Sequence, residues 1–141
     1  MIKRGDTIGY KKENYFRGVV LEDILNFVKE RANFSLVKLP NKKANKLAVD
    51  SSIDSESSKI IRTLINGNVS ELKKFLPVYG NIIKPLYLFL DEEIFLYAKL
   101  KGLKFKQKKK KEDKIQKFEN EFEKKHPEIK RAIVNSLLAL H

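Results

Sequence analysis

Short β-prone segments alternate with segments of helical apolar spacing along most of this chain, and this alternation constrains the fold more than any other feature. Apolar residues recur at helical spacing between residues 17 and 31, near residues 60–65, and between residues 91 and 100. Strands that alternate with helices form parallel sheets covered by helices. We therefore predict an α/β domain with a small parallel sheet of about four strands, at residues 6–10, 34–39, 46–49 and 81–84.

Prolines and capping residues mark the ends of these segments. Pro40 ends the second strand and Pro85 the fourth, because proline lacks the amide hydrogen that a sheet ladder needs. Asp54 or Ser55 is expected to cap the second long helix, and Asp91 the helix that runs to residue 100.

The C-terminal part has a different composition. Four consecutive lysines occupy residues 108–111, and two helical patterns then meet at residues 126–127. We expect one α/β domain over residues 1–106, with the basic segment and C-terminal helical pair of residues 107–141 packed on the same domain. The apolar stripes of the two helices consist of Ile115, Phe118 and Phe122, and of Ile129, Ile133, Leu137 and Leu140.

The charge balance points to phosphate-rich partners. The chain has 30 Lys and Arg against 18 Asp and Glu, a formal charge of +12, and this sign attracts phosphate backbones. RNA, DNA or an acidic protein are the natural partners. A lysine-rich surface without such a partner, or adaptation to heat, accounts for the same composition, so charge alone leaves the partner open.

Two absences in the sequence narrow the chemistry. There is no cysteine, which excludes disulfides, thiolate metal sites, cysteine-ligated iron–sulfur clusters and persulfide chemistry on this chain. No apolar run approaches the ~20 residues of a membrane span, and the first residues are polar, so we expect a cytoplasmic protein without a membrane partner.

No catalytic residue or metal ligand can be assigned from the sequence. His126 lies at a helix junction, where packing or capping is its expected role. The acidic clusters at residues 91–93 and 119–123 lack metal-site spacing and are interpreted as helix caps and solvated faces.

Several segments, in order along the chain, match the motifs of one family. The most specific is Ile-Lys-Pro-Leu at residues 83–86, followed by the helix over residues 92–98. Residues 122–127, with Glu-Lys-Lys-His-Pro, and residues 2–9 add matches near the two ends. These segments resemble the PP-loop ATPases that thiolate tRNA, which have an adenine nucleotide alpha hydrolase-like (HUP) fold. The resemblance implies a Rossmann-like sheet and a role in tRNA modification.

The phosphate loop of that family is absent. Where the family has Ser-Gly-Gly-Lys-Asp-Ser after the first strand, this chain has bulky Tyr15 and Phe16 and acidic Glu13. These residues oppose a close approach of phosphate to the backbone, so neither ATP nor magnesium is expected as a cofactor. The residues that remain for weak nucleotide binding are Lys11, Lys12, Arg17, Gly18 and Asp54.

Two further parts of the family pattern are missing. Family members that thiolate tRNA use cysteines, one of them after the segment that matches residues 103–105, where this chain has lysines and a glutamine. The interval between the strands at residues 34–39 and 46–49 is also too short for another strand and helix. The chain therefore resembles a degenerate, shortened relative, and we expect a pseudoenzyme without catalytic activity.

Residues 99–114 contain nine lysines and concentrate much of the positive charge. Such a stretch neutralises several phosphates, although a solvated loop can have the same composition. Together with the resemblance, it predicts a non-catalytic PP-loop-like domain that binds RNA, specifically tRNA. The expected RNA-binding residues are Arg62, Lys84, Lys99, Lys101, Lys104, Lys106, Lys108, Lys109, Lys110 and Lys111.

Two alternatives stay open at this point. In the first, the chain acts as a partner subunit, either of an intact, full-length tRNA-thiolation ATPase or of a second copy of itself in a homodimer. In the second, it is a residual ATP-dependent tRNA-modifying enzyme.

Overall fold

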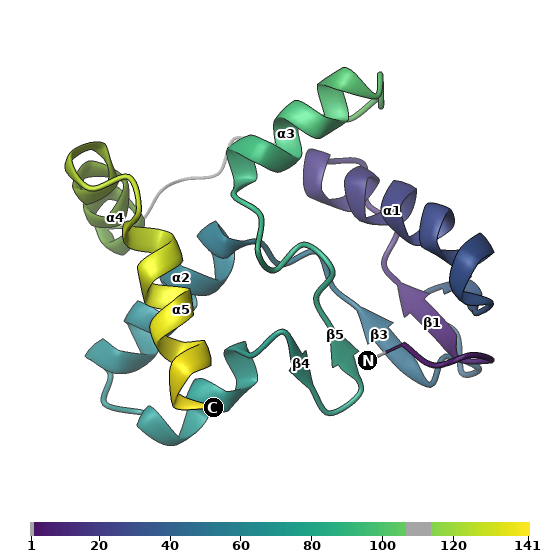
Figure 1. Cartoon of the computed structure of the whole chain (residues 1–141), viewed down its shortest axis with the longest axis horizontal. Helices are drawn as coiled ribbons and strands as arrows, with labels where there is room; N and C mark the ends of the chain where they lie inside the picture. Colours follow the sequence, from purple (N-terminus) through teal and green to yellow (C-terminus); the bar gives the residue numbers. More distant parts are fainter. Residues whose placement is uncertain (1, 107–113) are drawn as a thin grey trace.

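The computed structural model describes residues 2–106 and 114–141, in which a five-stranded sheet is flanked by helices (Figure 1). The strands lie in the order β2-β1-β3-β5-β4, and all neighbouring pairs are parallel except the antiparallel pair β4–β5. The predicted α/β class with a mostly parallel sheet is confirmed. The strands are β1 (Thr7–Tyr10), β2 (Ser35–Lys38), β3 (Lys46–Ala48), β4 (Val78–Tyr79) and β5 (Ile82–Ile83).

One of the five strands, β4, was not expected from the sequence. It has two residues, both exposed, and it turns back onto β5 through Gly80, whose φ of 59° is a left-handed conformation that suits glycine. A strand this short has no alternating apolar pattern, so the prediction of about four strands missed it.

Two helical groups cover the sheet, each with its own apolar cluster. Helices α1 (Phe16–Ala32) and α3 (Asp91–Leu100) pack together over β1, where Ile8, Leu25 and Ala98 are fully buried. Helix α2 (Ile53–Ile65), the 3₁₀ helix η1 (Val69–Phe75) and α5 (Ile129–Leu140) form the second group around Tyr87 and Val134. In the C-terminal part, α5 packs directly on α2 (Figure 1).

Helix α4 (Lys114–Lys125) packs differently from its expected orientation. The stripe of Phe118 and Phe122 faces outward, with exposed fractions of 62% and 38%, and Glu119 is the side chain that this helix buries. The interpretation of residues 119–123 as a solvated acidic face is therefore wrong for Glu119.

The helix caps also differ from the expected ones. Ser52, in an extended conformation, caps α2, and its hydroxyl accepts a hydrogen bond from the Ser55 amide at 3.3 Å. Asp54 and Asp91 instead lie in the first turns of α2 and α3, where carboxylates favour the positive end of the helix dipole. None of the helices in residues 2–106 and 114–141 combines the length and apolar character of a membrane span.

Candidate functional site

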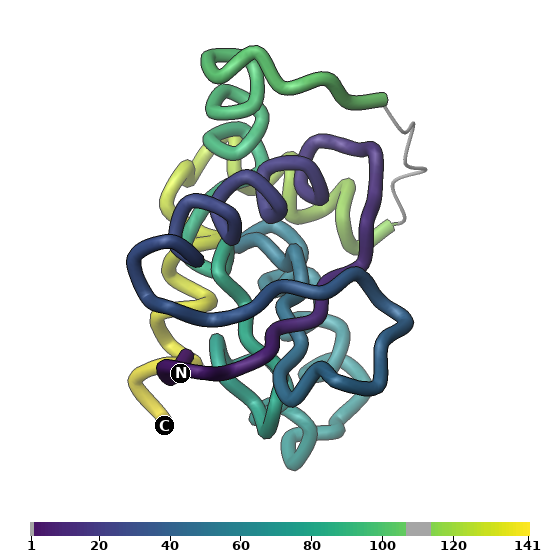
Figure 2. Tube along the Cα trace, turned by 90° about the vertical axis from the view of Figure 1, so that its right-hand side faces the viewer, coloured from purple at the N-terminus to yellow at the C-terminus, as the bar shows by residue number. Residues whose placement is uncertain are grey.

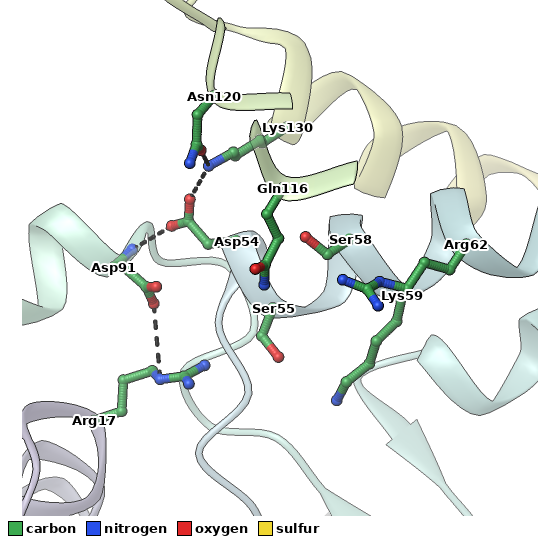
Figure 3. A pocket seen from close by; sticks show the side chains of 10 residues that line it. All are labelled: Arg17, Asp54, Ser55, Ser58, Lys59, Arg62, Asp91, Gln116, Asn120 and Lys130. Carbon is green, nitrogen blue, oxygen red and sulfur yellow. Dashed lines mark hydrogen bonds and ion pairs between the residues drawn. The ribbon is translucent and has the colours of Figure 1, made fainter. Parts of the chain in front are cut away.

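The loops that follow β1 and β3 leave the sheet between these two neighbouring strands and run in different directions. Strand β1 pairs with β2 on one side and with β3 on the other, so α1 and α2 leave the carboxyl ends of their strands in different directions. Open α/β sheets bind ligands at such a switch point. A cavity of about 480 Å³ lies there, and its walls come from α1, α2, α4, α5 and the start of α3 (Figure 3).

Tyr15 fills the crevice between β1 and β3. The residue precedes α1 in an extended conformation and is buried, and its hydroxyl donates a short hydrogen bond to the Asp50 carboxylate after β3. Phe16, next in sequence, packs edge-on against Phe95 and Phe105, with ring centroids 5.9 and 6.5 Å away. Immediately after β1, both aromatic side chains are thus packed against other parts of the chain, where the family's phosphate loop has small residues.

Gly18 has a packing role in this loop. It lies inside α1, and a Cβ atom added there would be 2.8 Å from the Glu13 Cβ and 3.1 Å from the Glu13 carbonyl oxygen. Glu13 thus folds back onto the first turn of the helix, and its carboxylate pairs with Lys11 at 3.2 Å. Lys12 pairs with Glu22 at 3.1 Å. Lys11, Lys12 and Gly18 are not among the residues that line the cavity.

Arg17 is the residue of this loop that reaches the cavity. It is 6% exposed, its Nε lies 3.9 Å from an Asp91 carboxylate oxygen, and its guanidinium is 5.5 Å from the centre of the Tyr15 ring. No hydrogen-bond partner of the Arg17 Nε is found in residues 2–106 and 114–141. Figure 3 shows Arg17 on the side of the cavity opposite α4 and α5.

Asp54 acts as a clamp between three helices. One carboxylate oxygen accepts the Asp91 amide at the start of α3 at 2.5 Å, and the other accepts the ammonium of Lys130 on α5 (Figure 3). Lys130 also pairs with Glu123 at 2.8 Å. Burial lowers the pKa of Lys130, but the hydrogen bonds that its ammonium donates to Asp54 and Glu123 outweigh this effect, and the net shift is upward. Both Asp54 oxygens are thus occupied by protein donors.

Lys84, one of the residues expected to bind RNA, lies inside the protein. It is 9% exposed, its ammonium is 3.2 Å from the fully buried Glu56 carboxylate, and it donates to the Lys74 carbonyl at 2.9 Å. Burial lowers the pKa of this ammonium, an effect that Glu56 partly offsets. Because the carboxylate of Glu56, in the first turn of α2, is fully buried, it requires a cation beside it, and Lys84, the residue after β5, provides that cation.

The other predicted RNA-binding residues lie at the surface or line the cavity. Arg62 lines the cavity, Lys99 lies over the Phe95 ring at 4.7 Å, and Lys101 pairs with Asp23 at 3.8 Å. Lys104 and Lys106 are exposed. The run from Lys108 to Lys111 lies outside the described residues.

The lysine-rich stretch is attached to the loop that follows β1. The Lys106 amide donates to the Asn14 carbonyl at 2.6 Å, and Phe105 is held between Phe16 and Phe95. The chain resumes at Lys114 on the same side of the molecule (Figure 2). Sequence reasoning missed this attachment, although Phe105, a single aromatic residue among lysines, marked it.

Glu119 also escaped sequence reasoning. It is 3% exposed and accepts hydrogen bonds from the Ser57 and Ser58 hydroxyls, both at 3.3 Å. Burial raises the pKa of its carboxyl group, against the opposing effect of the two hydroxyls and nearby cations. The serine-rich start of α2 was the available signal, because adjacent buried hydroxyls need polar partners.

No family model and no curated protein sequence matches this chain. Among solved structures it is similar to the U34-tRNA thiolase NcsA from Methanococcus maripaludis with its [4Fe-4S] cluster. The TM-score is 0.74 at 15% sequence identity, over 98% of this chain and 72% of the thiolase chain. The likeness establishes a relationship of fold alone: this chain has a Rossmann-like α/β fold with a mostly parallel sheet.

Proposed function

We propose that this protein is a non-catalytic PP-loop-like domain that binds RNA, specifically tRNA, through the lysine-rich stretch of residues 99–114. The observation that carries the proposal is the attachment of this stretch beside the filled crevice. The Lys106 amide bonds to Asn14, while the exposed side chains of Lys104, Lys106 and Lys114 face solvent.

Electrostatics supports nucleic acid as the partner. The net charge of +12 exceeds what solubility requires, and lysines that neutralise phosphates release the counterions bound to them. The fold likeness to a tRNA thiolase supports tRNA over other nucleic acids.

Three observations support a role without catalysis. Tyr15 fills the crevice at the switch point, and both carboxylate oxygens of Asp54 are taken by protein donors. The sequence also has no cysteine to carry sulfur or to hold an iron–sulfur cluster.

Replacing Lys108, Lys109, Lys110 and Lys111 with alanine tests the RNA-binding part. The dissociation constant for labelled tRNA is measured at several salt concentrations. We expect weaker binding and a shallower salt dependence, by up to ~0.9 in the logarithmic slope for each phosphate that the stretch no longer neutralises. A control variant with alanine at Lys3, Lys42, Lys43 and Lys73, all exposed, removes the same charge elsewhere and should keep most of the slope. Equal slopes in the two variants would contradict the assignment to this stretch.

A second candidate is the role of partner subunit, either with an intact ATPase or with a second copy. It is favoured by an apolar depression of about 370 Å³ between α1 and α3, where Phe89, Leu96 and Leu100 are 47%, 56% and 78% exposed. Light scattering of the purified protein and co-purification from the native host test it. A stable monomer that co-purifies with RNA alone rejects it.

The remaining alternative, an ATP-dependent enzyme, is tested by calorimetric titration with ATP and magnesium. The proposal predicts no heat of binding at millimolar nucleotide, and a saturating isotherm would contradict it.

A further inference from the structure

Three aromatic rings form a continuous row on the outer face of α4. Phe118 and Phe122 are stacked, with ring centroids 6.0 Å apart and planes at 25°, and His126 follows at 4.8 Å and 34° from Phe122. The three residues are four positions apart, a spacing that aligns side chains along one side of a helix. Their exposure means that this apolar surface is not used to stabilise the fold.

The opposite side of α4 fixes this orientation. Glu119 accepts hydrogen bonds from two serines of α2, and Glu123 and Asn120 contact the Lys130 ammonium at 2.8 and 3.0 Å. Rotating the helix to bury its rings would separate these groups and leave the Lys130 charge with fewer partners inside the protein. The outward position of the rings is therefore built into the packing.

Lysines surround the row of rings. A depression of about 400 Å³ is lined by Phe118, Phe122, Lys124 and Lys125 together with Glu121. Lys114, also exposed, lies one turn before Phe118 and is the first residue of α4. Glu121 lines the same depression, and a Glu128 carboxylate oxygen lies 3.9 Å from the His126 Nδ1, so three lysines accompany two carboxylates at this surface.

We propose that Phe118, Phe122 and His126 form a stacking platform for unpaired bases, with Lys114, Lys124 and Lys125 placed for the adjoining phosphates. The ligand class is a single-stranded RNA segment, because base faces are accessible to stacking only where a strand is unpaired. Positive groups beside aromatic faces are the combination by which proteins hold single strands without reading their sequence. An apolar protein partner would not require the flanking cations. The proposal rests on RNA binding as the proposed function and assigns it a second set of contacts.

The test compares two double variants with the unaltered protein. Phe118→Leu with Phe122→Leu keeps apolar bulk and removes the rings, while Phe118→Tyr with Phe122→Tyr keeps the ring faces. Binding is measured by fluorescence anisotropy with a labelled uridine dodecamer and with an RNA duplex of equal length. Circular dichroism and thermal unfolding establish that each variant is folded.

We expect the leucine variant to bind the single strand roughly tenfold to hundredfold more weakly, as loss of stacking requires. Its salt slope and its duplex affinity should stay unchanged, and the tyrosine variant should bind as the unaltered protein does. Equal single-strand affinity in all three proteins overturns the platform while leaving RNA binding intact. If the unaltered protein binds no RNA, the proposed function fails and the platform with it. Self-association that disappears in the leucine variant, without a change in RNA affinity, would identify a protein-docking surface and also overturn the proposal.

Discussion

The crevice at the carboxyl ends of β1 and β3 and the outer face of α4 use similar residue types in opposite ways. In the crevice, Tyr15 and Arg17 are buried. The Tyr15 hydroxyl donates to the Asp50 carboxylate, and the Arg17 Nε lies 3.9 Å from an Asp91 carboxylate oxygen. On α4, Phe118 and its neighbouring lysines are exposed. Aromatic and cationic side chains are thus buried in one region and exposed in the other.

Under the proposed function, this difference would place the binding surface on α4 and not at the carboxyl ends of β1 and β3. A phosphate loop requires small residues and free amides, and here bulky side chains take that space. The side chains that fill the crevice contribute to folding stability, whereas those on α4 are available to a ligand. Substitutions in the closed region should therefore reduce stability without affecting RNA affinity, and those on the open face should do the reverse.

The largest effect is expected when the Asp54 clamp is removed. Asp54→Ala leaves the Lys130 ammonium buried with Glu123 as its remaining carboxylate, and it frees the Asp91 amide. The free energy of unfolding should fall by about 3 kcal/mol, the lower end for a broken buried ion pair. Urea denaturation measures this change. Unchanged stability, or a tenfold loss of tRNA affinity in the folded variant, would place Asp54 in an open binding site instead.

Gly18→Ala should have the next largest effect. The added methyl group meets Glu13 at 2.8 Å, and such overpacking costs about 1–3 kcal/mol, against about 1 kcal/mol gained in helix propensity. We expect the free energy of unfolding, measured by thermal or urea denaturation, to fall by up to about 2 kcal/mol. Glu13→Gly in the same chain should restore part of it. A stabilised Gly18→Ala variant would show that Glu13 does not rest on the helix.

Tyr15→Phe tests the hydrogen bond across the crevice with a smaller change. It removes the hydroxyl that bonds to Asp50 and keeps the ring in place. The unfolding free energy should decrease by about 1 kcal/mol, the usual net value of one hydrogen bond. Calorimetry should still detect no ATP binding, because the ring itself fills the crevice. Nucleotide binding gained by this variant would mean that the hydroxyl alone keeps the site closed.

The smallest effect depends on pH and concerns Glu119, the buried residue of α4 that accepts hydrogen bonds from Ser57 and Ser58 of α2. Because its pKa is raised in the folded protein, folding favours the protonated form, and this contribution is lost as pH rises through the folded pKa. Glu119→Gln mimics the protonated form, so the variant should be at least as stable as the unaltered protein at neutral pH. The difference should shrink as pH falls toward the ordinary pKa of glutamate, in urea unfolding at several pH values. A difference independent of pH would contradict an ionised Glu119 at neutral pH.

Local pattern was sufficient to predict much of this fold. The helix expected from Asp91 to Leu100 has those bounds, and the stop at Pro40 and the junction at His126-Pro127 follow from backbone chemistry. The likeness in fold to a tRNA thiolase supports the relationship that the Ile-Lys-Pro-Leu segment suggested.

Contacts between distant residues determined what local pattern could not predict. Glu119 is buried because Ser57 and Ser58, more than sixty positions earlier, face it, and this pairing turns Phe118 outward. Lys84 is buried because Glu56 on another element needs a cation. Apolar spacing describes one helix at a time and contains no information about such polar partners.

The most direct test of these opposed roles is a titration of labelled tRNA with and without millimolar ATP and magnesium. A closed crevice and an open cationic surface predict the same dissociation constant in both titrations. Binding that requires ATP, or an affinity that changes tenfold on adding it, would contradict the account.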